Sequence, residues 1–199
     1  MCLFIETICY KDGQLQLIDL HNSRCNRTRN YFFGPMHNLQ LELFISVPKN
    51  LQDTTVKCRV VYGKDVINIE YESYQIRPVK SLRLVTDNTI DYAFKYADRS
   101  KLSQLYQLRG QADDILIIKD GFITDTYYAN IVLMKDGKWY SPQNPLLKGI
   151  RLESYLWENV VISAHIRPGD LPFYSEARII NAMIPIENSP VIPIYSIIQ

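Results

Sequence analysis

The sequence predicts an α+β fold, in which strands and helices are mixed without regular β-α-β alternation. Short apolar runs rich in β-branched residues recur along the chain, and Ile115–Ile118 is a clear example. Asp-Gly dipeptides between such runs, at Asp12-Gly13, Asp120-Gly121 and Asp136-Gly137, predict hairpins. There is no internal repeat and no low-complexity tail, so the strands and helices should belong to one domain or two small lobes.

The composition leaves room for a buried core and excludes several classes of partner. The chain has 199 residues, 47% of them hydrophobic, which is enough for a core. Its 22 basic and 21 acidic residues give a net charge of +1, so nothing argues for binding to nucleic acid or to an anionic membrane. The longest apolar runs are far too short to span a membrane.

The N-terminus and the cysteines predict a cytoplasmic protein. The first residues lack a basic region and soon reach Glu6, so they do not form a signal peptide. The four cysteines, Cys2, Cys9, Cys25 and Cys58, show no C-x-x-C spacing and are expected to be reduced thiols. The three histidines show no metal-like pairing with one another or with the cysteines, so no metal site is expected.

The first half of the chain reads as a hairpin, a helix and three further strands. Residues 3–10 and 14–18 form the hairpin, and a helix follows from Leu20 to Phe33, capped by Asp19 and stopped by Gly34-Pro35. A second short helix is expected over residues 38–46. The next strands are expected at residues 54–61, 66–74 and 82–86.

The second half reads as two helices set among strands. Apolar residues near one face predict a helix from Ser100 to Gln111, and a second amphipathic helix is expected over residues 146–160. The strands are expected at residues 115–118, 123–124 and 131–134, with Trp139-Tyr140 on the arm after the next turn. Pro185, Pro190 and Pro193 forbid a long helix near the C-terminus.

One carboxylate, Asp125, lies between two apolar strands in the stretch Asp114 to Val132. It could be solvated at the end of a strand, or it could face a cationic partner in a cleft. The local pattern by itself favours the solvated strand end.

Four blocks of sequence resemble the fold-type IV pyridoxal-phosphate enzymes. This family comprises the class IV aminotransferases, including D-amino-acid and branched-chain aminotransferases and 4-amino-4-deoxychorismate lyase. The blocks, which together cover most of the chain, are Phe4-Ile5-Glu6-Thr7-Ile8 with His21-x-x-Arg24, Lys95-Tyr96-Ala97-Asp98-Arg99, Gly121 to Val132, and Leu146-Leu147-Lys148-Gly149-Ile150. No block is decisive alone, but their shared order and spacing make the match fairly specific.

The resemblance implies a D-amino-acid-aminotransferase-like fold with the cofactor between two lobes. A small N-terminal α/β lobe is expected over residues 1–80, with the boundary near residues 75–88. A larger C-terminal barrel-like lobe is expected over residues 81–199 and would carry the cofactor lysine.

The resemblance assigns the cofactor lysine to Lys95. Its neighbours in Tyr92-Ala93-Phe94-Lys95-Tyr96 are largely aromatic, and partial desolvation lowers the pKa of a lysine. A neutral lysine can attack an aldehyde, as Schiff-base chemistry requires. The alternative is a surface lysine whose stem packs on apolar groups.

The resemblance also assigns a partner to the pyridine nitrogen. Asp125, in Thr124-Asp125-Thr126-Tyr127-Tyr128-Ala129-Asn130, stands where the family usually has glutamate. An anion there keeps the ring protonated and makes it a better electron sink. Aspartate is one methylene shorter, so either the backbone lies closer to the ring or a water bridges. Asn130 is expected to tie down the crossing backbone and to line the pocket.

The phosphate group of the cofactor needs fixed hydrogen-bond donors. Arg24 matches the family's phosphate arginine, and a guanidinium binds phosphate bidentately. Gly149 and Ile150 open a predicted helix whose free amides favour an anion. Asn181 and Ala182 lie where the family offers further amides, although an ordinary turn is an equal reading. The family arginine after Gly149 falls at Leu152 here, which leaves a role for Arg151 in doubt.

The substrates of the family are carboxylates, so basic residues should lie near the cofactor. Arg59 and Arg77 are the candidates, although the sequence favours a surface charge on a strand face over a ligand for each. The expected partners are a small amino substrate with a carboxylate and a second copy of the chain in a homodimer.

The resemblance leaves three activities open. The leading one is 4-amino-4-deoxychorismate lyase, which forms 4-aminobenzoate and pyruvate, because a lyase needs only one substrate pocket. The alternatives are an aminotransferase acting on a D- or branched-chain amino acid, and a non-catalytic relative that serves as an interaction protein.

Overall fold

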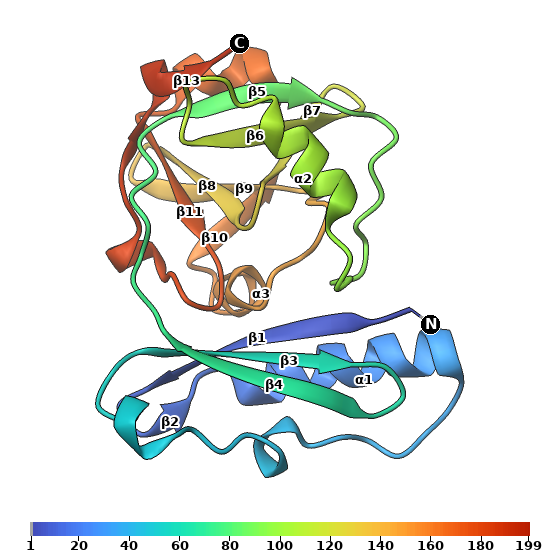
Figure 1. The fold of residues 1–199 in the computed structure, drawn as a ribbon. Helices are drawn as coiled ribbons and strands as arrows, with labels where there is room; N and C mark the ends of the chain where they lie inside the picture. The colour runs from blue at the N-terminus through green and yellow to red at the C-terminus, as the bar shows by residue number, and fades with distance from the viewer. Residues whose placement is uncertain (1) are drawn as a thin grey trace. The chain divides into compact units, whose positions relative to one another are not determined.

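The computed structural model describes residues 2–199 as two compact units, each with its own sheet (Figure 1). The first unit contains the chain up to Ile76 together with Phe94–Asp98. The second contains Arg77–Ala93 and Arg99–Gln199. One antiparallel sheet and one mixed sheet, with a few helices, confirm the predicted α+β class.

The first unit is a four-stranded antiparallel sheet with one long helix. The strand order is β2-β1-β3-β4, and the bounds are β1 Phe4–Lys11, β2 Gln14–Leu15, β3 Val56–Tyr62 and β4 Val66–Ser73. Alternate residues of β3 are buried, as expected for a strand with one face on a core. Phe4, Ile8 and Val60 from the sheet and Cys25 from helix α1 (Ile18–Phe33) share this core.

Two local predictions for the first unit were wrong. Helix α1 begins at Ile18 after Leu17, so Asp19 lies in the first turn and does not cap the helix. The helix expected over residues 38–46 is absent, and this stretch contains only the short 3-10 turn Leu41–Leu43, with another at Lys49–Leu51. Asparagine side chains of α1 accept hydrogen bonds from the backbone amides of Leu39 and Leu41, so these amides are not available for a continuous helix.

The segment Phe94–Asp98 belongs to the first unit, because it pairs with β1. The amide of Ile5 donates to the carbonyl of Lys95 at 2.9 Å, and the amide of Ala97 donates to the carbonyl of Leu3 at 2.8 Å. The rings of Phe94 and Tyr96 also pack around Phe4. The expectation that the C-terminal lobe carries Lys95 is therefore corrected.

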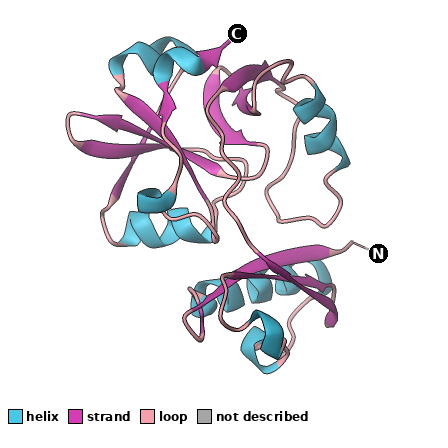
Figure 2. Cartoon of the chain, turned by 60° about the vertical axis from the view of Figure 1, so that its left-hand side comes forward, coloured by secondary structure: helices cyan, strands magenta, loops and turns pink. Residues whose placement is uncertain are grey.

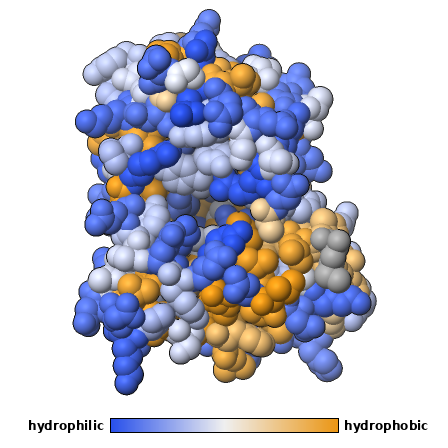
Figure 3. Space-filling model, viewed as in Figure 1, coloured by the Kyte–Doolittle hydropathy of each residue, from blue (hydrophilic) through white to orange (hydrophobic). Residues whose placement is uncertain are grey.

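Several apolar side chains of the first unit reach its surface. Leu43 is 76% exposed and Ile67 is 56% exposed, and Tyr31 at the end of α1 is 72% exposed. Figure 3 shows apolar residues gathered on the face of this unit that is turned to the viewer.

The second unit is built on a larger, curved sheet (Figure 2). Its main order is β10-β9-β8-β7-β6-β5-β13, and β11 pairs with both β8 and β12. The bounds are β5 Leu82–Thr86, β6 Asp114–Lys119, β7 Phe122–Thr126, β8 Asn130–Lys135, β9 Lys138–Pro142, β10 Val161–Ala164, β11 Glu176–Ile180, β12 Ile192–Pro193 and β13 Ile197–Ile198. The strands β6 and β8 are buried almost throughout, which explains their continuous apolar runs.

The two helices of this unit are shorter than predicted. Helix α2 spans Ser100–Gln107 and helix α3 spans Ile150–Trp157. Residues 146–148 stay out of α3, because side chains of β7 and β8 bind the backbone of Leu147. The left-handed backbone at Asn159, with φ 56°, follows the end of α3. Short 3-10 turns lie at Pro168–Phe173, Ile186–Asn188 and Ile194–Ser196.

The turn between β6 and β7 has the predicted geometry. Asp120 and Gly121 have φ values of 52° and 79°, as a type I′ hairpin turn requires. Within residues 2–199, no helix has the length and apolar character needed to cross a membrane.

Candidate functional site

The candidate residues fall into two sets, one in each unit. Lys95, Arg24 and Arg59 belong to the first unit. The second unit contains the rest, namely Asp125, Asn130, Gly149, Ile150, Asn181, Ala182 and Arg77.

Asp125 lies in a bulge of strand β7. Leu116 pairs with Thr126 and Ile118 pairs with Ile123, so Thr124 and Asp125 together face only Ile117. The Thr124 hydroxyl donates to the Ile117 carbonyl at 2.9 Å, which fixes the bulge. Asp125 is only 7% exposed, so the reading of a solvated strand end is wrong. A bulge changes the direction of the side chains that follow it, and bulges are common beside active sites.

The side chain of Asn130 connects Asp125 to the segment before helix α3. Its Nδ2 donates to Asp125 Oδ1 at 2.6 Å and to the Leu147 carbonyl at 2.9 Å, and its Oδ1 accepts from the Gly149 amide at 3.0 Å. The second carboxylate oxygen, Asp125 Oδ2, accepts from the Leu147 amide at 3.0 Å. The structure therefore brings four sequence positions, including three predicted site residues, into one buried network.

Position 149 has no room for a side chain. A Cβ atom there would lie 2.3 Å from Asn130 Oδ1, far inside van der Waals contact. Because Asn130 Oδ1 is held by the Gly149 amide itself, it cannot move away without breaking the network. The glycine therefore serves the close approach of two segments, as the sequence suggested for this backbone.

Asn181 and Ala182 form a tight turn beside helix α3. Asn181 and Ile184 exchange two backbone hydrogen bonds, and Asn181 Oδ1 accepts from the amides of Met183 and Ile184. The Arg151 guanidinium donates to the Ala182 carbonyl at 3.3 Å, so the turn is tied to the first turn of α3. The side chain of Arg151 thus connects helix α3 to the turn at Asn181-Ala182.

Leu152 is a core residue. It is 1% exposed and packs with Val132 and Ile180, so the position where relatives carry arginine is apolar here. Arg151 faces a different environment, with its guanidinium carbon 5.8 Å from the centre of the Tyr155 ring.

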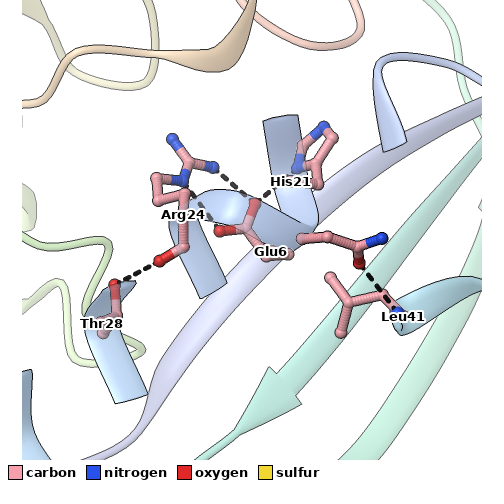
Figure 4. A network of polar contacts seen from close by, with 6 residues as sticks. Glu6, His21, Arg24, Thr28 and Leu41 are labelled. Atoms are coloured by element: carbon pink, nitrogen blue, oxygen red, sulfur yellow. Dashed lines mark hydrogen bonds and ion pairs between the residues drawn. The ribbon is translucent and has the colours of Figure 1, made fainter. Parts of the chain in front are cut away.

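Figure 4 shows a buried ionic cluster around Glu6 in the first unit. Arg24 donates to both carboxylate oxygens, from Nε to Oε1 at 2.8 Å and from an Nη atom to Oε2 at 2.6 Å. His21 Nδ1 lies 2.5 Å from Glu6 Oε2. Glu6 and His21 are completely buried, and Arg24 is 8% exposed. The guanidinium that the resemblance assigns to the phosphate is therefore rigidly held from one side.

The electrostatics of this cluster favour an ionised Glu6 and a neutral His21. Burial by itself would raise the pKa of Glu6, but the charge and hydrogen bonds of Arg24, with the hydrogen bond of His21, lower it to about 2. Burial lowers the pKa of His21, and the pull of Glu6 offsets this only in part. Since Glu6 accepts, Nδ1 carries the imidazole proton. Nε2 is then an acceptor, and it has no hydrogen-bond partner among the described residues.

Lys95 is half-buried on the segment that pairs with β1, and its charge is among those that lower the pKa of His21. The two candidates for substrate binding have partners of their own. Arg59 forms an ion pair at 3.0 Å with Glu70 on the neighbouring strand. Arg77 donates to the Tyr106 hydroxyl at 3.2 Å and lies 5.4 Å from the centre of the Tyr128 ring.

Sequence reasoning did not assign roles to Glu6 and His21, although both carried a signal. Glu6 lies two residues from both Phe4 and Ile8, so the three side chains share the core face of the strand. A carboxylate on this face needs a cationic partner. His21 and Arg24 are three residues apart on a helix and so point the same way.

Glu6→Gln should destabilise the protein, because it leaves the buried Arg24 charge without a counter-charge. A folded-state pKa of about 2 against an ordinary value of 4.5 corresponds to about 3 kcal/mol of stability. This stability is present above pH 4.5 and is lost as the pH falls towards 2. Urea unfolding should therefore show that Glu6→Gln lowers the free energy of unfolding more at pH 7 than at pH 3.

Glu72→Gln is the matched control. Glu72 pairs with Lys57 on an exposed strand face, where an ion pair contributes roughly 0–1 kcal/mol. Equal effects of the two substitutions at pH 7 would contradict a special role for the buried cluster.

Comparisons with known proteins agree with this arrangement. A family model described as Amino-transferase class IV matches residues 90–197, more than half of the chain. A protein of Haemophilus influenzae (strain ATCC 51907 / DSM 11121 / KW20 / Rd), described as uncharacterized, is 35% identical over 180 residues, which are 89% of this chain and 96% of the relative.

Solved structures extend the similarity to the whole fold. A protein of Haemophilus somnus 129pt described as a "putative 4-amino-4-deoxychorismate lyase" has a TM-score of 0.87 and 28% identity, covering 94% of this chain and 98% of that one. A hypothetical aminotransferase from Mycobacterium tuberculosis in its PLP-bound form has a TM-score of 0.75 and 14% identity, covering 96% and 80%.

The similarity of fold confirms the predicted D-amino-acid-aminotransferase-like architecture. The matched region contains Lys95, Asp125 and Gly149 in the order that the resemblance requires. By the match over more than half of its length and its 35% identity to a relative of nearly equal extent, this chain belongs to the class IV aminotransferase family, whose enzymes use pyridoxal phosphate.

Proposed function

We propose that this protein is a pyridoxal-phosphate-dependent lyase that converts 4-amino-4-deoxychorismate to 4-aminobenzoate and pyruvate. The observation that supports this most directly is the 28% identity with the Haemophilus somnus protein, across nearly the whole length of both chains. The buried Asp125–Asn130–Gly149 network supports the retention of a cofactor site in this chain.

The residues present fit pyridoxal phosphate. The first turn of α3 follows Gly149, and the free amides of a helix N-terminus favour an anion. Gly149 contributes by letting Asn130 approach this turn closely, because its own amide donates to Asn130. The neighbouring turn at Asn181-Ala182 adds further backbone groups, and Arg24 is a fixed cation. These groups would hold the phosphate, and Asp125 would hold a proton on the pyridine nitrogen.

The cofactor supplies an electron sink for the carbon that bears the amine. Lys95 would bind the cofactor and, once the substrate amine displaces it, take the proton from that carbon. The same amine would return the proton to the methylene of the enolpyruvyl group, which leaves as pyruvate. The ring then becomes aromatic, no atom is gained or lost overall, and one substrate pocket is enough.

An aminotransferase acting on a D- or branched-chain amino acid is the second candidate. The fold similarity to an aminotransferase of known structure supports it, and both reactions would use Lys95 and Asp125 in the same first steps. A non-catalytic interaction protein is a third reading, to which the aspartate at 125 and the apolar Leu152 give some weight. For either enzyme, we propose a small amino substrate with a carboxylate, a homodimer and a cytoplasmic location.

The purified protein should bind pyridoxal phosphate through Lys95 and release 4-aminobenzoate from 4-amino-4-deoxychorismate. Borohydride reduction with the cofactor present, followed by peptide mapping, should label Lys95, and Lys95→Ala should lose both label and turnover. Incubation with D-alanine or leucine and a keto acid tests the alternative. Label on another lysine would overturn the assignment, and a protein that stays colourless with added cofactor would favour the non-catalytic reading.

Asp125→Asn should abolish turnover and also weaken the fold. Both oxygens of Asp125 accept hydrogen bonds, so the amide group of asparagine would oppose one of the two donors, Asn130 Nδ2 or the Leu147 amide. An unsatisfied buried donor costs about 1–3 kcal/mol. Urea unfolding would measure this loss, and turnover with the cofactor saturating would measure the loss of the electron sink.

Asp125→Glu is the matched variant, because it keeps the charge and both acceptors in a longer side chain. We expect it to retain partial turnover. Near-normal turnover of Asp125→Asn would mean that Asp125 only supports the strand crossing, even if the family assignment holds.

The proposed homodimer can be tested by sedimentation. Exposed apolar side chains on the first unit, such as Leu43 and Ile67, favour association. A sedimentation coefficient of a monomer at micromolar concentration would contradict it.

A further inference from the structure

Asp114, at the start of β6, is a buried carboxylate that is only half satisfied. It is 0% exposed. Its Oδ1 accepts from the amides of Ile115 at 2.8 Å and Tyr127 at 3.3 Å. Its Oδ2 accepts no hydrogen bond from any residue that the structure describes. Buried polar atoms are normally paired, so this oxygen requires an explanation.

The ionised form of Asp114 lowers the stability of the fold. Burial raises the pKa of Asp114 to about 6, and the two amides and the charges of Arg77 and Arg99 offset this only in part. The folded state therefore holds the proton more tightly than the unfolded state, and stability falls as the pH rises from about 4 to about 6. An asparagine would keep the shape and one acceptor and would remove this pH-dependent loss, but its NH2 group would take the place of the unpaired Oδ2 oxygen. The ionised carboxylate thus has a cost in stability at neutral pH, and we ask what its charge contributes.

Tyr127, whose amide binds Asp114, has partners for its backbone amide, its carbonyl, its ring and its hydroxyl. Its amide donates to Asp114, and its carbonyl accepts from the Arg99 guanidinium at 2.5 Å. The ring lies between the Tyr106 ring, with centres 4.4 Å apart, and the Arg99 guanidinium, 4.4 Å from the ring centre. The Tyr127 hydroxyl is 3.2 Å from the hydroxyl of Ser103. Side chains from helix α2 and the residue before it thus clamp one residue of the β7–β8 crossing.

Three side chains lie near enough to Asp114 to interact with its charge. Arg77 lies before β5, Arg99 directly precedes α2, and Tyr128 follows Tyr127 in the crossing. Arg77 lies 5.4 Å from the centre of the Tyr128 ring and donates to the Tyr106 hydroxyl of α2. The charges of the two guanidinia favour the ionised form of Asp114, although neither guanidinium donates to Asp114 Oδ2.

The crossing needs this support, because little strand pairing holds it. Strands β7 and β8 pair only at Asp125 and Asn130. Between them, Thr126 and Ala129 bond to each other, and the remaining contacts are those of Tyr127 and Tyr128. A shift of Tyr127 would move Asp125, two residues before it, and Asn130, three residues after it.

We propose that Asp114 is a positioning residue: its Oδ1 holds the Tyr127 amide, its negative charge attracts the two nearby guanidinia, and the Asp125–Asn130 pair is thereby fixed in the geometry that the reaction needs. The proposal rests on the proposed function of Asp125. It explains why a carboxylate occupies a site where a neutral group would be more stable, since active-site geometry is commonly kept at the expense of stability.

The test compares Asp114→Asn with Asp113→Asn, its exposed neighbour, whose carboxylate accepts from Lys80 and Ser81. The resistance of Asp114→Asn to urea, measured relative to the wild type, should increase as the pH rises from 4 to 7.5. At pH 7.5 the Tyr127 amide of the variant should exchange its hydrogen faster, because a charge-assisted hydrogen bond is replaced by a weaker neutral one. Turnover should fall roughly ten- to hundredfold, as small misplacements of catalytic groups do.

The pH dependence gives a second readout. Wild-type turnover should fall below about pH 6, where Asp114 becomes protonated, and Asp114→Asn should lack this acid limb. Asp113→Asn should behave as the wild type throughout. An Asp114→Asn protein with normal turnover, the acid limb retained and normal Tyr127 exchange would overturn the proposal.

A third measurement needs no variant and decides the question if Asp114→Asn does not fold. In an NMR pH titration of the wild type, the chemical shifts of the Asp114 carboxyl carbon and of the Tyr127 amide proton should change with the same midpoint. Different midpoints for the two nuclei would overturn the proposal. Failure of the proposed function would appear differently, as a wild-type protein that binds no pyridoxal phosphate although the Tyr127 amide still titrates with Asp114.

Discussion

The side-chain amide of Asn130 is the connection on which the second unit's site depends. It joins a bulged strand, a strand crossing and the entry of a helix, by donating to Asp125 and Leu147 and accepting from Gly149. An amide is the one small group that can do this, because two donors and an acceptor sit on one rigid plane. The network fixes where α3 begins and which way Asp125 points. Its tightness also requires the glycine at 149, where no Cβ can fit.

In the first unit, a buried carboxylate holds the buried cation Arg24. The Glu6 carboxylate lies at the centre of the cluster in Figure 4, where its two oxygens accept from Arg24 and one of them also contacts His21. A buried charge is tolerated only when paired and hydrogen-bonded, and here the pairing also orients the guanidinium. The neutral imidazole extends this arrangement, since its Nδ1 proton is fixed on Glu6 and its Nε2 is left as an acceptor. Positioning and stability therefore come from the same contacts in this unit.

The second unit separates positioning from stability. Tyr127 is held by a carboxylate, a guanidinium and a ring stack, while the carboxylate itself remains partly unsatisfied in the interior. Leu152, at the position where the resemblance led us to expect arginine, is an apolar residue of the core. Arg151 instead bonds the Ala182 carbonyl, so a cation remains between α3 and the turn at Asn181-Ala182. In the second unit, Arg151 therefore provides a cation beside the turn at Asn181-Ala182, although position 152 is apolar.

The sequence by itself determined the strands, the tight hairpin turns and the family. Strands β3, β4 and β5 lie where alternation and turn residues predicted them, because these signals are local and the backbone obeys them directly. The Asp120-Gly121 turn follows for the same reason. The order of the blocks around Arg24, Lys95, Asp125 and Gly149 was enough to indicate the fold, which the comparisons confirm.

Only the tertiary structure decided the ends of the helices and the partners of the polar residues. Residues 38–46 and 146–148 have helical patterns, but side chains from other elements bind their backbone amides, and neither stretch forms an α-helix. Asp125 reads as a strand end until Asn130 and Leu147 are seen to cover it. Glu6 and Asp114 both adjoin apolar strand residues in the sequence, Glu6 within a strand and Asp114 at the start of one. Whether such a group is fully paired or left half satisfied depends on which residues the fold brings to it, and that information is not local.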